Sequence, residues 1–243
     1  MRVGVYVDGY NLYYGGRKLC GRSTAGWRWL DVRSLARTLV GAQAGWPHAE
    51  VTRVIYCTAM VSSATSQSAH QDQDVYLKAL LATTSVDHIE YGHYVTRVKN
   101  ALIAVRGSGR RPKVVTSGWP IQVQDASGLP MEDARFMASV LDQEEKGSDV
   151  NLATHLIVDV WSDSIDAAVV ISNDSDLRLP IALAREHVPV GLVNPRGGVF
   201  AGDLRAGKDD GVGNHWFRRL YGGDLVAHQL PNPAGHFFRP EGW

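Results

Sequence analysis

Carboxylates follow the predicted strands of this sequence. Asp8 ends the apolar run at residues 2–7, and Asp174 and Asp176 follow the run at residues 167–172. Asp149 stands at the start of a predicted helix. Like charges in one place repel and raise each other's pKa, so we expect a cation to compensate them. Oxygen ligands suit Mg²⁺ or Mn²⁺ rather than zinc. The sequence therefore predicts a metal site formed by these four aspartates.

Each acidic segment also has a simpler interpretation. Asp8 with Gly9 is a common turn pair, and Asp174 with Asp176 is typical of a helix N-terminus. Asp149 is equally typical of the first turn of a solvated helix. Three independent helix caps at one edge of a sheet are less expected than one acidic site. The combination therefore favours the site.

The elements that position these residues alternate along the chain. Apolar runs at residues 2–7, 51–57, 86–95, 167–172 and 188–193 predict strands. Helical spacing of apolar residues is found at 30–40, 68–82, 149–161 and 175–187. Such alternation predicts βαβ units and a parallel sheet covered on both faces. Ligands of these sheets bind beyond the carboxyl ends of the strands, where the aspartates stand.

Composition places the chain among globular proteins. Its 243 residues are 44% hydrophobic and 21% charged, which excludes a disordered chain and a coiled coil. Cys20 and Cys57 cannot form a disulfide framework or a zinc cluster. No apolar run approaches the roughly 20 residues of a membrane span, and the N-terminus lacks a signal peptide. We expect a soluble cytoplasmic protein without a membrane partner. The formal net charge of zero gives no global sign of nucleic-acid binding.

Three segments of the chain carry a family resemblance. They read Val-Tyr-Val-Asp8-Gly-Tyr-Asn11-Leu, then Glu145-Lys146-Gly-Ser-Asp149-Val-Asn-Leu-Ala, then Val-Val-Ile-Ser172-Asn173-Asp174-Ser-Asp176-Leu. These segments, in this order, resemble the signatures of NYN-domain proteins of the PIN-like ribonuclease superfamily. The resemblance implies a Rossmann-like three-layer α/β sandwich with a mostly parallel sheet. Some relatives carry an acid where this chain has His155.

The resemblance also implies an activity, the hydrolysis of phosphodiester bonds in single-stranded RNA. Asp8, Asp149 and Asp174 would hold Mg²⁺ or Mn²⁺, which supplies hydroxide at neutral pH. Asp176 would bind the metal or orient the water, and Asn11 would bind the metal or a phosphate oxygen. Two alternatives stay open. One is a non-catalytic RNA-binding or regulatory module, and the other is a binder of nucleotides or phosphates at the same edge.

Basic and aromatic residues extend the hypothesis of an RNA substrate. Lys146 is a candidate contact to the scissile phosphate or a plain surface pair with Glu145. Arg110, Arg111 and Lys113 lie in a segment rich in Gly and Ser and are candidates for phosphate contacts, or for a solvated loop.

Tyrosines and histidines are further candidates for a functional role. The tyrosines at positions 10, 13 and 14 are candidates for base stacking or for packing the first helix. We interpret His88 and His93 as surface histidines of a strand rather than as ligands.

The domain prediction is one main domain with two additions. Residues 1–194 form the NYN/PIN-like domain, with an inserted segment at about 96–143 that is rich in Gly, Pro, Ser and Arg. Residues 195–243 form an irregular C-terminal extension packed on that domain. A homo-oligomer or a regulatory protein partner is left open by the sequence.

Overall fold

The computed structural model describes residues 1–108, 111–118, 122–205, 207 and 209–243. The chain divides into two compact units, one of Met1–Tyr94 with Glu145–Trp243 and one of Val95–Glu144. The segment at about 96–143, predicted to be an insertion, falls within the second unit. The assignment of residues 1–194 and 195–243 to a domain and an extension stays a prediction.

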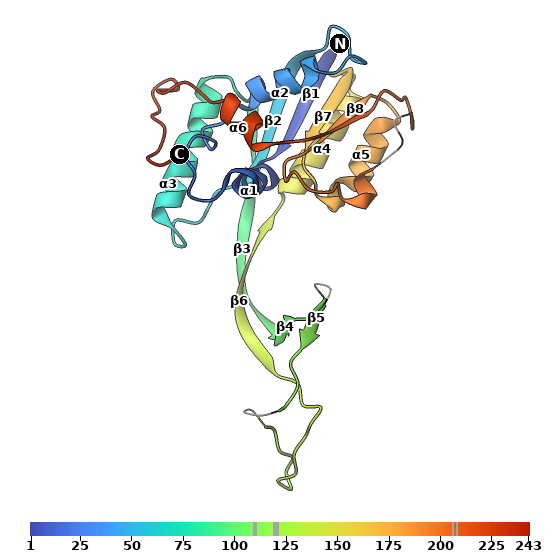
Figure 1. The fold of residues 1–243 in the computed structure, drawn as a ribbon. Coiled ribbons are helices and arrows are strands. Elements are labelled where there is room, and N and C mark those ends of the chain that lie inside the picture. The colour runs from blue at the N-terminus through green and yellow to red at the C-terminus, as the bar shows by residue number, and fades with distance from the viewer. Residues whose placement is uncertain (109–110, 119–121, 206, 208) are drawn as a thin grey trace. The chain divides into compact units, whose positions relative to one another are not determined.

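A mostly parallel sheet organises the first unit (Figure 1). Among the described residues it has seven strands in the order β6-β3-β2-β1-β7-β8-β9. The neighbouring pairs from β3 through β9 are all parallel. The strands are β1 (Arg2–Asp8), β2 (Glu50–Ala59), β3 (His88–Leu102), β6 (Met137–Lys146), β7 (Ala167–Ile171), β8 (Val190–Asn194) and β9 (Trp216–Arg219). The predicted α/β class with a parallel sheet is confirmed.

Helices cover both faces of this sheet. Val3, Val5 and Val7 of β1 pack with α1, α2, α3 and α6, while Tyr6 packs with α4 and α5 on the opposite face. The helices are α1 (Gly9–Cys20), α2 (Val32–Gly41), α3 (Gln67–Ala82), α4 (Ser148–Trp161), α5 (Arg178–Arg185) and α6 (Gly222–Ala227). Because both faces are covered, β1, β7 and β8 are continuous apolar runs rather than alternating ones.

Side-chain caps start several helices directly after strands or turns. Asp8 accepts a hydrogen bond from the backbone N–H of Asn11 and begins α1. Asp174 accepts one from the N–H of Asp176 and begins the short 3₁₀ helix η2 (Ser175–Leu177). The predicted helix at 175–187 is therefore split into η2 and α5. Pro180 contributes to this, since a proline is tolerated only in the first turn of an α-helix.

The second unit is an extended, largely exposed structure. It contains the antiparallel pair β4 (Ala104–Arg106) and β5 (Pro112–Val114). Arg97 forms an ion pair with Glu144 at 2.9 Å, and Lys99 forms ion pairs with Asp142 and Glu144. These pairs hold the portions of β3 and β6 that belong to this unit.

The C-terminal segment adds regular structure to the first unit. β9 pairs with β8, and η3 (Gly202–Leu204) and α6 also belong to this segment. The ring of Trp243 lies 6.5 Å from that of Trp29 and 5.6 Å from that of Tyr76. Within the described part of the chain, no helix combines the length and apolar character needed to cross a membrane.

Candidate active site

The carboxyl edge of the sheet carries a group of carboxylates, which we call the acid site. It consists of Asp8 at the end of β1, Asp149 in the first turn of α4, and Asp174 and Asp176 around η2. The charges of Asp8, Asp174 and Asp176 all act on the carboxyl of Asp149. The structure thus brings together the four aspartates that the sequence singled out, because parallel strands end at one edge.

Asp8 is the buried member of the acid site, with 4% of its surface exposed. One carboxylate oxygen accepts the backbone N–H of Asn11 and the other accepts the hydroxyl of Ser172, each at 2.8 Å. Ser172 also accepts the backbone N–H of Asp174 at 3.1 Å, so it links the two acids. Burial, with a smaller contribution from the charge of Asp174, raises the pKa of Asp8 to about 6 despite these hydrogen bonds.

Asp149 is the more accessible member and is only partly buried. Partial burial and the charges of Asp8 and Asp174 raise its pKa to about 7. At neutral pH this carboxyl is present in both its protonated and its ionised form. A group in that state can accept a proton and return it, which is the requirement for general acid–base catalysis.

Asn11 contributes an acceptor to the acid site. The residue is 2% exposed, and its side-chain Oδ1 has no hydrogen-bond partner among the described residues. Buried polar atoms nearly always have a partner, so an exception of this kind requires an explanation. This acceptor is buried beside Asp8, which caps the N–H of the same residue.

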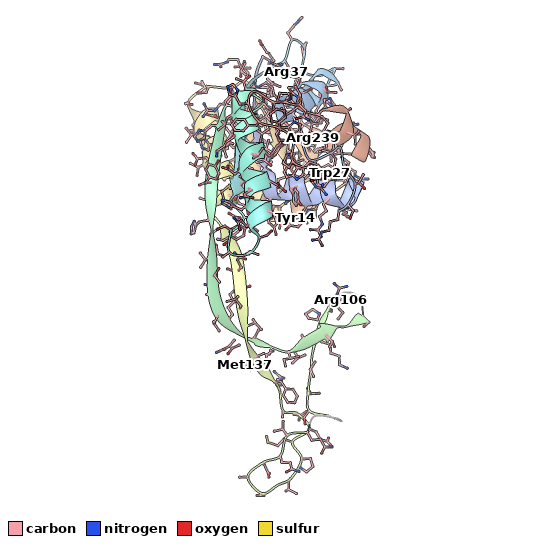
Figure 2. The ribbon with its side chains drawn as sticks, turned by 90° about the vertical axis from the view of Figure 1, so that its left-hand side faces the viewer. Tyr14, Trp27, Arg37, Arg106, Met137 and Arg239 are labelled. Atoms are coloured by element: carbon pink, nitrogen blue, oxygen red, sulfur yellow. The ribbon has the colours of Figure 1, made fainter. Side chains whose placement is uncertain are left out.

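Three tyrosines of α1 follow Asp8 in the chain. The rings of Tyr10 and Tyr14 lie 4.4 Å apart, and those of Tyr13 and Tyr14 lie 5.3 Å apart. All three side chains are at least 40% exposed. Burial, with smaller contributions from Tyr14 and Glu145, raises the pKa of Tyr94. Tyr14 is labelled in Figure 2, as is Trp27, whose ring lies 5.7 Å from that of Tyr13.

The exposed rings of Tyr10, Tyr13 and Tyr14 form a surface that we call the tyrosine face, and a guanidinium lies beside it. Arg17 lies 5.8 Å from the centre of the Tyr14 ring. Charge from Arg196 also acts on Tyr10, opposing the burial and the hydrogen bond with Tyr14 that raise the Tyr10 pKa to about 12. Exposed aromatic rings with cations beside them form a surface suited to a flat, anionic ligand.

The other predicted contacts stay predictions. Lys146 is the last residue of β6, three positions before Asp149. Arg111 and Lys113 lie at the β4–β5 pair of the second unit, and Arg110 lies outside the described residues. Asp8, Asp149, Asp174 and Asp176 all belong to the first unit.

Sequence reasoning missed one further group of side chains. His88 and Glu90 on β3 meet His155 on α4, and one oxygen of Glu90 lies 2.8 Å from His88 Nε2 and 3.0 Å from His155 Nε2. The spacing of His88 and Glu90 was a usable signal, because residues i and i+2 of a strand share a face. No sequence pattern indicated that His88 and Glu90 would contact His155, which is 65 positions from Glu90.

Comparison with known proteins gives one informative match. No protein-family profile matches the chain. The chain is 27% identical over 266 aligned positions to 6-hydroxy-3-succinoylpyridine 3-monooxygenase HspA of Pseudomonas putida, covering 100% of this chain and 75% of that protein. A crystal structure of a Vibrio parahaemolyticus protein of unknown function matches with 14% identity and a TM-score of 0.44, covering 89% of this chain and 91% of that one. A TM-score at that level carries no argument.

The similarity to a monooxygenase corrects the activity expected from the sequence. The predictions of a ribonuclease, of a hydrolase and of an RNA-binding module are wrong, and so is the prediction of Mg²⁺ or Mn²⁺ as cofactor. The physical reason is that carboxylates at strand ends serve more than one chemistry. Asp8 and Asp174 each use a carboxylate oxygen to cap the helix that follows. The raised pKa values of Asp8 and Asp149 mean that these carboxyls hold their protons to a higher pH, which reduces the charge repulsion between them without a metal ion.

Proposed function

We propose that this protein is a monooxygenase that hydroxylates a flat aromatic heterocycle. The observation that carries the proposal is the similarity to the Pseudomonas monooxygenase, which extends over the whole chain. One oxygen atom of O₂ is inserted between a ring carbon and its substituent, which at position 3 of the relative's named substrate is the succinoyl group, and the other oxygen leaves as water. The balance requires two electrons and two protons. A reduced nicotinamide nucleotide, acting directly or through a reductase, is the class of electron donor that supplies them.

Asp149 is the residue that we assign to proton transfer. A hydroxyl group on the aromatic ring donates its proton to the Asp149 carboxylate, which increases the electron density of the ring carbons. The pKa of about 7 keeps a share of this carboxylate ionised and its protonated form a competent acid at neutral pH. Partial burial sustains that pKa, together with the charges of Asp8 and Asp174.

The tyrosine face is the surface that we assign to substrate binding. The rings of Tyr10 and Tyr14 offer an exposed aromatic surface on the helix that Asp8 caps. Offset stacking on such rings suits a flat heterocycle, and Arg17 beside Tyr14 suits a carboxylate substituent.

Monooxygenases activate O₂ with a cofactor, commonly a flavin. A flavin dinucleotide in a parallel α/β fold places its phosphates on a helix N-terminus after a glycine-rich turn. The turn after β1 instead reads Asp8-Gly9-Tyr10, and Asp8 already caps α1. The neighbouring aspartates repel phosphates at the same edge. These residues do not fit a flavin dinucleotide, and we derive no step through one.

The finer description of the fold is also a proposal. We infer a PIN-like, NYN-type sandwich, supported by three motifs whose acids meet at one edge of a parallel sheet. Residues 1–194 would form that domain, with the insertion at about 96–143 and the extension at 195–243. A shared fold carries many unrelated activities, so this proposal is compatible with a monooxygenase.

Isotope labelling tests the proposed function. The purified protein is incubated with 6-hydroxy-3-succinoylpyridine, a reduced nicotinamide nucleotide, a reductase and ¹⁸O₂. The mass of the product is then measured by mass spectrometry. We expect one ¹⁸O atom in the product. Product oxygen drawn from water, or no product from folded protein under any reductant, would refute the proposal.

Two substitutions test the assigned residues in the same assay. Asp149→Asn should lower kcat by about 10²–10³, a typical contribution of acid–base catalysis. Asp166→Asn is the matched control, because Asp166 pairs with Arg2 at the start of β1, at the opposite edge of the sheet. An Asp149→Asn enzyme as fast as the Asp166→Asn control would remove Asp149 from the mechanism.

The tyrosine face is tested by binding. Tyr14→Ala should raise KM with a smaller effect on kcat, since the ring contact exists in the ground state as well as the transition state. Phe238→Ala removes another exposed ring, one outside the tyrosine face, and serves as control. Equal KM values for the two variants would contradict the assignment of substrate binding to this face.

A further inference from the structure

His88, Glu90 and His155 form a compact group that the proposed acid–base chemistry does not use, and we call it the His–Glu–His cluster. One ligand atom from each side chain lies within 4.8 Å of the other two. The two imidazole rings are 5.6 Å apart, with both Nε2 atoms directed at the same Glu90 oxygen. The cluster belongs entirely to the first unit.

The fold brings these side chains together from two elements. His88 and Glu90 alternate with buried Ile89 on β3, so both lie on the face that α4 covers. Leu152 and Leu156 of α4 are buried in the core on that face. His155 precedes Leu156 in the helix and is only partly buried. Side-chain exposures of 51%, 35% and 23% for His88, Glu90 and His155 leave an entry path from solvent.

Two imidazole nitrogens and one carboxylate oxygen are a recognised donor set for metals. Imidazole suits zinc, copper, iron and nickel, and the combination of two histidines with one carboxylate leaves coordination positions open. In oxygenases this combination holds Fe²⁺. We propose that His88, Glu90 and His155 bind one divalent transition metal ion, and that this ion is Fe²⁺ in the working protein. The choice of iron rests on the proposed function, whereas the binding of a metal does not.

The charge state of the cluster suits a cation. Hydrogen bonds from His88 and His155 lower the pKa of Glu90, so this carboxylate is ionised at neutral pH. A metal ion would lie between the two Nε2 atoms and the Glu90 oxygen, which already converge on one point.

The position of the cluster connects it to the acid site. Asp8 is in register with Cys57 of β2, and Cys57 is in register with Glu90 of β3. Neighbouring strands are about 4.8 Å apart, which places the backbones of Asp8 and Glu90 roughly 10 Å from each other. The charges of Glu90, Asp8 and Asp149 all act on the buried Cys57 thiol, in agreement with this spacing. An aromatic substrate at the acid site would lie within reach of an ion at the cluster.

Metal titration of the purified full chain tests the inference. The chelator-treated protein is titrated with Fe²⁺ under anaerobic conditions, and in parallel with Zn²⁺, by calorimetry, with metal analysis after gel filtration. We expect one equivalent to bind and a rise in Tm that grows with metal concentration. Failure of the wild-type protein to bind one equivalent of either ion would overturn the proposal.

Variants locate the ion. Glu90→Gln and His155→Ala should each weaken binding by about 100-fold, while His93→Ala, which removes an exposed histidine of the same strand, should bind as the wild type does. Thermal melts without metal confirm that each variant is folded. Unchanged affinity in Glu90→Gln, or binding that is lost in Asp149→Asn instead, would place the metal elsewhere and refute the cluster.

The experiments distinguish a failure of the proposed monooxygenase activity from a failure of the proposed metal site. Binding of metal at the cluster without incorporation of ¹⁸O would leave the metal site standing and refute the monooxygenase. Incorporation of ¹⁸O by protein that binds no metal would support the monooxygenase and overturn the metal site.

Discussion

Replacing Asp149 with asparagine should stabilise the folded protein at alkaline pH and leave it almost unchanged in acid. The folded-state pKa of Asp149 is about 7, against an ordinary value of 3.8. In the unfolded chain the carboxyl ionises near its ordinary value, but in the folded chain it holds its proton to a higher pH. Ionisation of Asp149 therefore costs folding free energy, and the loss develops between pH 3.8 and 7 and is complete above that range.

The size of the effect follows from the shift and from solvent exposure. At 1.36 kcal/mol per pKa unit, a rise from 3.8 to about 7 corresponds to at most about 4 kcal/mol. Asp149 is only partly buried, so solvent screening reduces this to about 1–2 kcal/mol. The dipole of α4 favours a negative charge in its first turn by about 0.3–1 kcal/mol and opposes the gain. The net gain at pH 8 is then about 1 kcal/mol, or about 2–4 °C in Tm.

Thermal and urea melts of the wild type and Asp149→Asn between pH 4 and 9 measure this. The gain should be small at pH 4 and reach its full size by pH 8. Asp166→Asn is a control of opposite sign, because Arg2 holds the pKa of Asp166 down to about 2. That ion pair stabilises the fold above pH 3.8 and is lost as the pH falls towards 2, so Asp166→Asn should lose stability at pH 8. An Asp149→Asn gain of equal size at pH 4 and pH 8 would show that charge repulsion is not its cause.

Three further outcomes are expected from the packing. Leu156→Ala should cost about 2–5 kcal/mol in urea unfolding because Leu156 is fully buried, whereas Val158→Ala on the exposed side of the same helix should cost little, and similar losses would contradict the packing of α4. Gly15→Ala should destabilise α1, since an added Cβ would lie under 3.0 Å from the carbonyl oxygen of Pro195. Gly41→Ala should instead stabilise the protein by about 0.5–1 kcal/mol in the same melts, because a Cβ there meets nothing within 4 Å and alanine favours the helix.

The local pattern of the sequence determined the elements and the sheet edge. The runs at residues 2–7 and 167–172 were readable as buried strands because both of their faces are covered, which removes any polar alternation. Parallel strands linked by helices all end at one edge, so the meeting of Asp8 with Asp174 followed from their positions in the chain. The same residues did not determine the activity. Carboxylates at an edge can hold a metal or move a proton, and similarity over the whole chain, rather than the motifs, favoured a monooxygenase.

Only the tertiary structure decided which side chains meet across elements. Glu90 and His155 are 65 positions apart, and no local periodicity joins a strand residue to a particular turn of a distant helix. Their contact depends on how Leu152 and Leu156 seat α4 against the sheet. The raised pKa of Asp149 likewise needed the three-dimensional arrangement, because burial and the nearby charges set it, and neither is a property of the sequence around position 149.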